Sequence, residues 1–530
     1  MQKMFSDEIE LVPKAAHGSE SVEAIGQNEI YDKGSLTWTL CMSALAGSWI
    51  LGTVCIVLGA IIKAPKHGTT SVGHYYYRYT PNHDWPIFYS SPFEAELLPL
   101  LLNFIMTVLL DGLGLIHATS LRWALNERLT FNANLRLFTS SRSHVALSWP
   151  ANILFAGLLI LCYTSTSLLF ANQPSQAFCD LHPGLGSAKY LGCGDDVHIS
   201  TPALCTLGAG MLGQAALATW QYVSVRVPTW SSNPLDTAWA IVVNGSRSMV
   251  PGRCMMNVHD ANLPANPQLT IPRQRSIWTA HGEAKWIMRY VWLVLGLSIL
   301  FFISVEAVMA ANIARVDGTG CNNCGTYPGL NWNILPDTNG ISTSAAIIKE
   351  QSTAAHAGLF IVLFLITGVV TMALHCTELI TVLTRDEVTW RHCTSKTPYT
   401  ARQNAVVRAA TSWPAVTLFL LKVVLHWLSG NAVRYAYNWG IFLRVPQILY
   451  LCIGMALLAA FATFLCFKGP SGPQPATFGH VQTLVNVVDE WSLLMFWGDK
   501  GVIDSNGEVR HAGTAGLPLE PIVMGAIYAG

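Results

Sequence analysis

Ionisable side chains interrupt several of the long apolar segments in this chain of 530 residues. In the second segment, polar or small residues recur at intervals of four, four, three and three, namely Asn103, Thr107, Asp111, Gly114 and His117. A helix turns by about 100° per residue, so these positions share one face. An aspartate and a histidine on one helix face can bind and release a proton or hold a cation.

The sixth apolar segment has a matching polar face, formed by Thr367, Thr371, His375 and Glu378, and Glu306 lies toward the outer end of the fifth. Ionisable residues near the centre of a membrane helix usually face a bundle interior or a water-filled cavity, because lipid solvates them poorly. Polar side chains also hold membrane helices together. Two roles therefore stay open for both polar faces, namely a transport or proton-relay path and contacts between helices. His117, His375 and Glu378 fall near the cytosolic ends of their segments, so ordinary interfacial positions and capping of the inner loops are open for them as well.

Lys422 and His426 lie four residues apart in the short segment Pro414–Leu428 and therefore share a face. A buried charge without a partner costs several kcal/mol, so Lys422 requires a carboxylate nearby. Asp111 and Glu378 are the candidates. We expect Asp111 and Lys422 to lie in the interior of a bundle and to depend on each other.

Helices must position these side chains, because the composition is that of a membrane protein. Hydrophobic residues make up 51% of the chain and charged residues 12%, whereas soluble domains carry about 25% charged residues. The apolar segments have the length that crosses a bilayer as a helix, and lipid offers the backbone no hydrogen-bond partner. We expect an all-α polytopic transmembrane helix bundle of about eight spans: Thr37–Ile62, Glu96–Ile116, Ala151–Ala171, Thr201–Tyr222, Ile287–Asn312, Ala355–Ile380, Pro414–Leu428 and Val445–Phe467.

A sequence repeat relates the first four spans to the last four. LIHATSLRWAL (Leu115–Leu125) and ALHCTELITVL (Ala373–Leu383) share the pattern H-x-T-x-L-x-x-x-L. Each is followed by a basic stretch, the tetrapeptide SWPA (Ser148–Ala151 and Ser412–Ala415) and another apolar segment. Order and spacing predict two tandem four-helix repeats, which makes the short Pro414–Leu428 segment a span. SWPA predicts a helix start, with Ser as the N-cap and Pro in the first turn.

The distribution of Lys and Arg orients the chain. With eight spans, the loops on the side of the termini carry about 21 of the 31 Lys and Arg residues, which places both termini in the cytosol. The plasma membrane and an endomembrane both fit. A short cytosolic helix is expected from Pro234. The expected units are an N-terminal tail, a four-helix unit, a central loop, a second four-helix unit and a C-terminal tail, at 1–36, 37–222, 223–286, 287–467 and 468–530.

Four cysteines fall in loops on the opposite, oxidising side. An even number there predicts disulfides, most simply Cys179–Cys193 and Cys321–Cys324. The CNNC sequence at Cys321 could instead form half of a metal site or a redox pair, although the chain has no second CxxC. We therefore expect no metal and no cofactor.

Several function classes lack their sequence signatures. The chain has no Walker loop, no G-x-G-x-x-G after a strand, no HExxH and no GxSxG, which argues against a nucleotide-driven pump or a common hydrolase. Net charge is zero and no basic run occurs, so nucleic acid is not an expected partner. We lean against an enzyme.

Several short stretches carry a family resemblance. HATSLRWAL, TWSSNPLDTA, LTRDEVTWR and the tail sequences WGDKG and RHAGT with the final YAG resemble a family of polytopic membrane proteins from filamentous fungi. The resemblance covers the chain from about Trp38 onward. It implies a fungal multi-span membrane protein, and because the family has no assigned activity it implies no catalytic residues.

Three functions fit the sequence. The first is a transporter or channel for an ion or small molecule, with its path between the two repeats. The second is a non-catalytic scaffold or receptor that presents the central loop and tail to a cytosolic protein. The third is a membrane-embedded enzyme of lipid or specialised metabolism. Water reaching Asp111 and Lys422 would favour a transporter or channel. A fully packed bundle with an ordered cytosolic platform would favour a scaffold or receptor. A lateral lipid-facing cleft would favour an enzyme.

Overall fold

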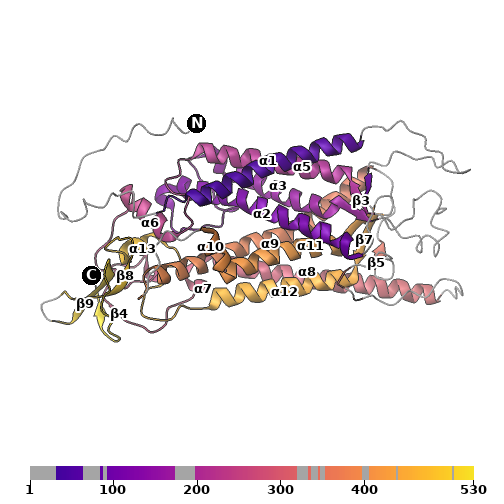
Figure 1. Ribbon diagram of the computed structural model, residues 1–530. Coiled ribbons are helices and arrows are strands. Elements are labelled where there is room, and N and C mark those ends of the chain that lie inside the picture. Colours follow the sequence, from indigo (N-terminus) through magenta and orange to yellow (C-terminus); the bar gives the residue numbers. More distant parts are fainter. Residues whose placement is uncertain are drawn as a thin grey trace, which may run out of the picture.

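The computed structural model describes residues 32–63, 84–87, 92–172, 197–318, 332, 334–335, 344–346, 353–396, 405–436, 440–503 and 507–529. Eight helices in these ranges are long and apolar enough to cross a membrane, and they form one elongated bundle (Figure 1). The all-α polytopic bundle that the sequence predicts is therefore confirmed. The helices are α1 (Ser35–Lys63), α2 (Pro92–Leu125), α3 (Trp149–Leu169), α5 (Thr201–Ser224), α8 (Gly282–Gly318), α9 (Thr353–Cys393), α11 (Trp413–Ala432) and α12 (Val445–Phe467).

Large apolar side chains cover the outside of these helices. Ile50, Leu101, Leu300 and Leu365 are each about half exposed, on α1, α2, α8 and α9. A soluble protein does not expose such a continuous apolar surface, so lipid is the solvent that this surface fits. The protein is a multi-pass membrane protein.

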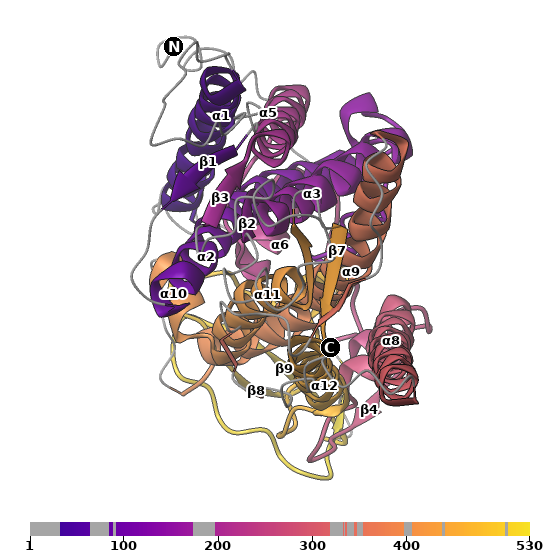
Figure 2. The same ribbon diagram turned by 90° about the vertical axis from the view of Figure 1, so that its right-hand side faces the viewer.

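Helices of the two halves pack in the same pairs. In the first half α1 lies along α5 and α3 packs on α5, and in the second half α8 lies along α12 and α11 packs on α12. Contacts between the halves are made mainly by α2 with α11 and by α3 with α9 (Figure 2). The polar faces expected on α2, α9 and α11 therefore belong to the helices that meet between the halves.

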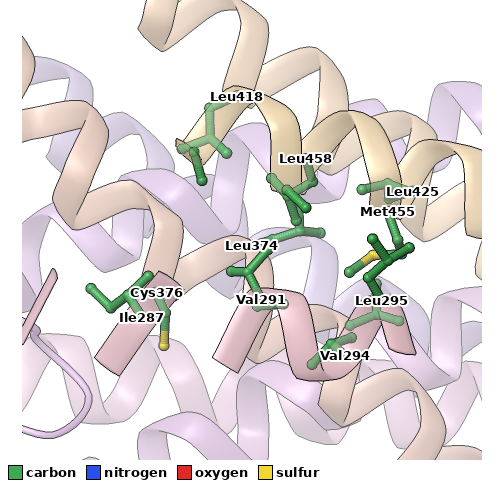
Figure 3. Packing of buried hydrophobic residues seen from close by; sticks show 14 of the residues in the cluster. Ile287, Val291, Val294, Leu295, Leu374, Cys376, Leu418, Leu425, Met455 and Leu458 are labelled. Carbon is green, nitrogen blue, oxygen red and sulfur yellow. The ribbon is translucent and has the colours of Figure 1, made fainter. Parts of the chain in front are cut away.

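A hydrophobic core holds the second half together (Figure 3). Its side chains come from all four helices of that half. These apolar contacts fix the four helices against one another without the help of polar contacts. The labelled members are Ile287, Val291, Val294 and Leu295 of α8, Leu374 and Cys376 of α9, Leu418 and Leu425 of α11, and Met455 and Leu458 of α12.

Two small antiparallel sheets lie at one end of the bundle, called the strand end (Figure 1). The first has the order β1-β3-β2, and the second has the order β5-β7-β6. The sequence reading predicted helices only, and the third span predicted to reach Ala171 gives way to β2 after Leu169. The strands are β1 (Asp84–Ile87), β2 (Phe170–Asn172), β3 (Val197–Ser200), β5 (Ser344–Ala346), β6 (Val433–Ala436) and β7 (Gly440–Arg444).

A layer called the platform covers the opposite end, built from the central loop (226–281) and the tail (468–529). A four-stranded sheet of order β4-β10-β9-β8 joins the two, because β4 of the loop pairs with β10 of the tail. The short helix expected from Pro234 is confirmed as α6. The platform contains α6 (Pro234–Val243), α7 (Ile277–Ala280), α13 (Val481–Val487), β4 (Gln268–Leu269), β8 (Phe496–Val502), β9 (Val509–Ala515) and β10 (Ile527–Tyr528).

Helix α9 reaches from the bundle into the platform. The apolar pattern placed its end at Ile380, but the helix continues to Cys393. Glu387 and Arg391 form an i,i+4 pair at 2.6 Å that supports this extension. The other Glu387 oxygen accepts the backbone N–H groups of Thr477 and Phe478, at 2.8 and 2.9 Å. The tail is thus bound directly to a membrane helix.

Both SWPA sequences start helices, as predicted. Ser148 and Ser412 occupy the N-cap positions of α3 and α11, and Pro follows in the first turn. The capping role given to the serines is wrong, because neither side chain accepts a capping hydrogen bond. The Ser148 hydroxyl donates instead to the carbonyl of Val145 at 2.7 Å.

The predicted disulfides lie outside the described residues, because Cys179, Cys193, Cys321 and Cys324 do. The nine cysteines that are described are free thiols. All but Cys205 are buried, as expected for small hydrophobic side chains.

Candidate functional site

Charged side chains from both halves meet inside the bundle. The Lys422 ammonium on α11 donates to Asp111 Oδ1 on α2 at 2.6 Å and to Glu378 Oε2 on α9 at 3.1 Å. The pair expected from the sequence is thus in contact, and Glu378, the second candidate, shares the same ammonium. Together with Arg136 and His375, these residues are called the central cluster.

The central cluster lies at mid-depth. Lys422 is the tenth residue of the 20-residue helix α11, so it is about 15 Å from either end at 1.5 Å per residue. Its contacts bring Glu378 to the same level. Glu378 stands near the end of the predicted apolar segment, but α9 continues beyond that segment to Cys393, so the residue lies well inside its helix.

Arg136 completes the cluster from the platform end. Its guanidinium donates to both oxygens of Glu378, at 3.2 and 2.9 Å, and to His375 Nδ1 at 2.9 Å. A guanidinium can only donate, so Nδ1 accepts and a neutral His375 carries its proton on Nε2. Arg136 belongs to the loop between α2 and α3, which the sequence analysis treated as a cytosolic loop.

Two residues of the polar face of α2 position Arg136. His117 Nε2 lies 3.0 Å from the backbone oxygen of Arg136. At Gly114, a Cβ atom would lie 2.7 Å from Arg136 Nη1, so a larger residue requires the guanidinium to shift from its contacts with Glu378. Gly114 on an otherwise polar face was the one sequence signal that a large group approaches there.

The exposed side-chain area differs within the cluster. The Lys422 side chain is 3% exposed and that of Arg136 is 9% exposed, whereas the side chains of Asp111 and Glu378 are each 28% exposed. The two carboxylates balance the two cations. An added cation can therefore bind at Asp111 and Glu378 if a resident cation moves away, and both carboxylates are open to it.

The same residues have the donor types of a cation site. Asp111, His375 and Glu378 each offer a ligand atom, and these atoms lie within 4.8 Å of one another. Oxygen and imidazole donors fit a proton as well as a divalent ion. The sequence analysis expected no metal. This geometry permits one, provided that Lys422 and Arg136 release the carboxylates.

A line of aromatic rings leads from the cluster toward the strand end. The His426 ring stacks on Tyr163 of α3 at 3.5 Å and 6°, and Tyr163 lies 6.3 Å from His375. Neither nitrogen of His426 has a hydrogen-bond partner among the described residues, nor does Nε2 of His375. Buried polar groups are nearly always hydrogen-bonded, so water or an ion is expected at these atoms. Tyr163 carried no sequence signal, because it stands in an ordinary apolar segment.

Beyond these rings lies a small cavity between α3, α9 and α11. It has a volume of about 10 Å³, which is room for about one water molecule. Its polar lining comes from both halves and consists of Thr164, Ser167, Thr367 and Ser429. The polar seam between the halves thus continues toward the strand end, and it is narrow there.

The other sequence candidates do not join the cluster. Asn103 donates to the Pro99 carbonyl, Thr107 to the Asn103 carbonyl and Thr371 to the Thr367 carbonyl, all within their own helices. Glu306 is half-buried on α8, and its Oε2 has no hydrogen-bond partner within the described ranges. Among the described residues, these side chains do not form a binding site together.

A second buried ion pair joins the halves at the strand end. Arg434 donates to Glu96 Oε1 at 2.9 Å, and the Asn431 amide donates to Glu96 Oε2 at 3.0 Å. The Glu96 and Arg434 side chains are only 3% and 6% exposed. This strand-end pair was not predicted from the sequence, since Glu96 marks the edge of the second apolar segment and Arg434 follows the seventh.

Comparison with known proteins adds no relative. No family model, no curated protein and no solved structure matches the chain. The fungal resemblance therefore stays a prediction, and the roles of these residues rest on their geometry.

Proposed function

We propose that the protein is a membrane transport protein that binds a proton or a small cation at the central cluster. One observation carries this proposal: at mid-depth in the bundle, two carboxylates keep accessible surface, at 28% each, while the cations that pair with them are almost fully buried. Charges that only hold helices together gain nothing from such access. Carboxylates that exchange a cation require it.

The geometry supports a competition mechanism. Protonation of Asp111, or binding of a cation to it, removes one of the two carboxylate charges that hold Lys422. Glu378 stays paired with Arg136 and keeps its 3.1 Å contact with Lys422, so the ammonium is held by one carboxylate while the substrate ion is bound. Arg136 blocks the way toward the platform, while His375, Tyr163 and His426 mark the way toward the strand end. This arrangement is that of a closed state.

Duplication of a four-helix unit fits this mechanism. Element order and sheet order are the same in the two halves, with strands β1, β2 and β3 standing where β5, β6 and β7 stand in the second. We infer two tandem repeats whose relative movement opens the seam to either side, a common plan in transporters. The Lys and Arg distribution puts the platform, and with it both termini, in the cytosol.

A scaffold or receptor is the second candidate, and the platform favours it. The central loop and the tail form one ordered sheet, and the tail is bound to α9 through Glu387. Such a layer is suited to present a surface to a cytosolic protein. In this alternative the central cluster only holds the halves together.

Flux measurements on the purified protein in liposomes separate these functions. A pH-sensitive dye inside the vesicles reports proton entry under an imposed potential, and Na⁺, K⁺, Mg²⁺ and Ca²⁺ are tested in turn. We expect the wild type to conduct one of these ions and Asp111→Asn to lose that flux. The matched control is Glu96→Gln with Arg434→Gln, which neutralises the strand-end pair. Absence of flux from wild-type protein for every ion would contradict transport and leave the scaffold.

A further inference from the structure

A groove lies where the membrane bundle meets the platform. It has a volume of about 670 Å³ and is bounded by the extension of α9, the short helix α10 (Ala405–Thr411), the start of α11, the end of α12 and the tail. Trp413 is the first residue of α11, and Leu465 stands two residues before the end of α12. Since both helices are spans, the groove straddles the level of the bilayer surface.

One side of the groove is apolar and open to lipid. Its wall includes Val407, Trp413, Leu465 and Phe478. Val407 and Trp413 are about half exposed, at 52% and 50%, so this wall continues into the lipid-facing surface. Tryptophan is typical of the headgroup level of membrane proteins.

The rim of the groove is basic. Among the described residues that line the groove, Arg385, Arg391, His392 and Lys468 are basic and Glu387 is the single acidic residue. Glu387 is already neutralised by Arg391 and by two backbone N–H groups of the tail. The Arg391 guanidinium in turn donates hydrogen bonds to the carbonyls of Ser471 and Gln474.

Two basic residues of the rim, Lys468 and Arg385, are available to bind a ligand. Lys468 is exposed directly after the last residue of α12 and forms no ion pair with a described residue. Within the described part of the chain, the one ion pair of Arg385 is a 3.6 Å contact with its neighbour Asp386, whose carboxylate also accepts the Asn132 amide at 2.7 Å. A groove with a positive rim and an apolar wall matches a ligand with an anionic head and an apolar tail.

We propose that this groove binds an anionic phospholipid from the leaflet on the platform side. The lipid phosphate lies between Arg385 and Lys468, and an acyl chain follows Val407 and Trp413 back into the bilayer. Basic pockets at the surface of membrane bundles bind such headgroups, and each basic residue near the surface adds to the affinity. The bound lipid bridges α9, α11, α12 and the tail, and thereby stabilises the junction between bundle and platform.

Native mass spectrometry and thermal unfolding of detergent-solubilised protein test this site. Phosphatidylserine, phosphatidic acid, phosphatidylcholine and inorganic phosphate are added separately. We expect the two anionic lipids to bind and to raise the unfolding temperature, and phosphatidylcholine and inorganic phosphate to do neither. Arg385→Gln with Lys468→Gln should weaken binding by about tenfold or more, since two charges near the surface are removed. The matched control is Arg226→Gln with Lys285→Gln, two cations at the same end but outside the groove.

A second pair of variants covers the case in which the double variant fails to fold. Val407→Glu places a carboxylate in the groove at an exposed position, and Val407→Gln is its neutral match. We expect the Glu variant to repel the anionic lipids and the Gln variant to retain most binding. Stabilisation by inorganic phosphate alone, equal stabilisation by phosphatidylcholine, an equal loss in the control variant, or equal binding by both Val407 variants would each overturn the proposal.

Discussion

The central cluster and the strand-end pair both connect α2 to the second half through an acid and a base, yet they differ in the hydrogen-bonding atoms and the side-chain area that remain without a partner. Both Glu96 oxygens are hydrogen-bonded, and almost no side-chain area of Glu96 or Arg434 is exposed. In the central cluster, Asp111 and Glu378 keep exposed area, and His375 and the neighbouring His426 keep nitrogens without a described partner. A saturated pair holds helices together, whereas spare hydrogen-bonding capacity indicates a place where something else binds.

The strand-end pair should give the largest stability effect. Arg434→Met leaves Glu96 charged and buried, and breaking a buried pair from one side costs about 3–5 kcal/mol. We expect little folded protein by size-exclusion chromatography after solubilisation. Glu96→Gln with Arg434→Met should recover much of it, because no charge is then left alone. A normal yield of Arg434→Met would contradict the structural role of this pair.

The central cluster should tolerate the equivalent change better. Lys422→Met removes a cation, but Asp111 and Glu378 retain exposed side-chain area and Glu378 retains Arg136. We therefore expect a smaller loss of unfolding temperature than for Arg434→Met, together with loss of ion flux. Asp111→Asn in the Lys422→Met background should recover part of the loss of stability. Simple addition of the two losses would show that Asp111 and Lys422 are not partners.

Gly114→Ala tests the place of Arg136 in this comparison. The new methyl group would lie 2.7 Å from the guanidinium, and overpacking of this kind costs about 1–3 kcal/mol. We expect a lower unfolding temperature and a displaced Arg136, which raises ion leak in liposomes. Gly157→Ala on α3 is the matched control, because no other atom lies within 4 Å of the Cβ added there. Equal behaviour of the two variants would refute the positioning role of Gly114.

The smallest effect is expected in the platform, where a third acid–base pair is partly exposed. His511 Nε2 lies 3.0 Å from Asp489 Oδ2, and this hydrogen bond raises the pKa of His511 to about 9. Its stabilising contribution is therefore complete below the ordinary pKa of about 6.5 and is lost as the pH rises through about 9. We expect the tail to be cleaved faster by trypsin at pH 9 than at pH 7. His511→Gln should reduce this difference, and an unchanged pH dependence in that variant would rule out His511 as its source.

The sequence allowed the spans to be predicted wherever apolar runs have clear ends. Val445–Phe467 was predicted and found with the same bounds, since Arg444 and Lys468 flank an uninterrupted run. The predicted end of α9 was too early. Helical backbone hydrogen bonds continue after the hydropathy falls as long as polar side chains pair with one another, as Glu387 and Arg391 do.

The candidate site was predicted only in part. Asp111, Glu378 and Lys422 could be found because each is a charge in an apolar helix, where a partner is physically required. Arg136 and Arg434 could not, because a basic residue outside an apolar segment looks like any loop residue until the fold turns it inward. Contacts over more than two hundred residues of sequence, such as Arg136 with Glu378, leave no local pattern.

Charge movement after a rapid pH jump on a solid-supported membrane tests the central claim most directly. Proteoliposomes of the wild type and of Glu96→Gln with Arg434→Gln should both give a transient current, because their central carboxylates can still exchange a cation. Asp111→Asn should give none, although it folds. A wild-type-sized current from Asp111→Asn, or its loss in the variant with the neutral strand-end pair alone, would contradict the assignment of ion binding to the central cluster.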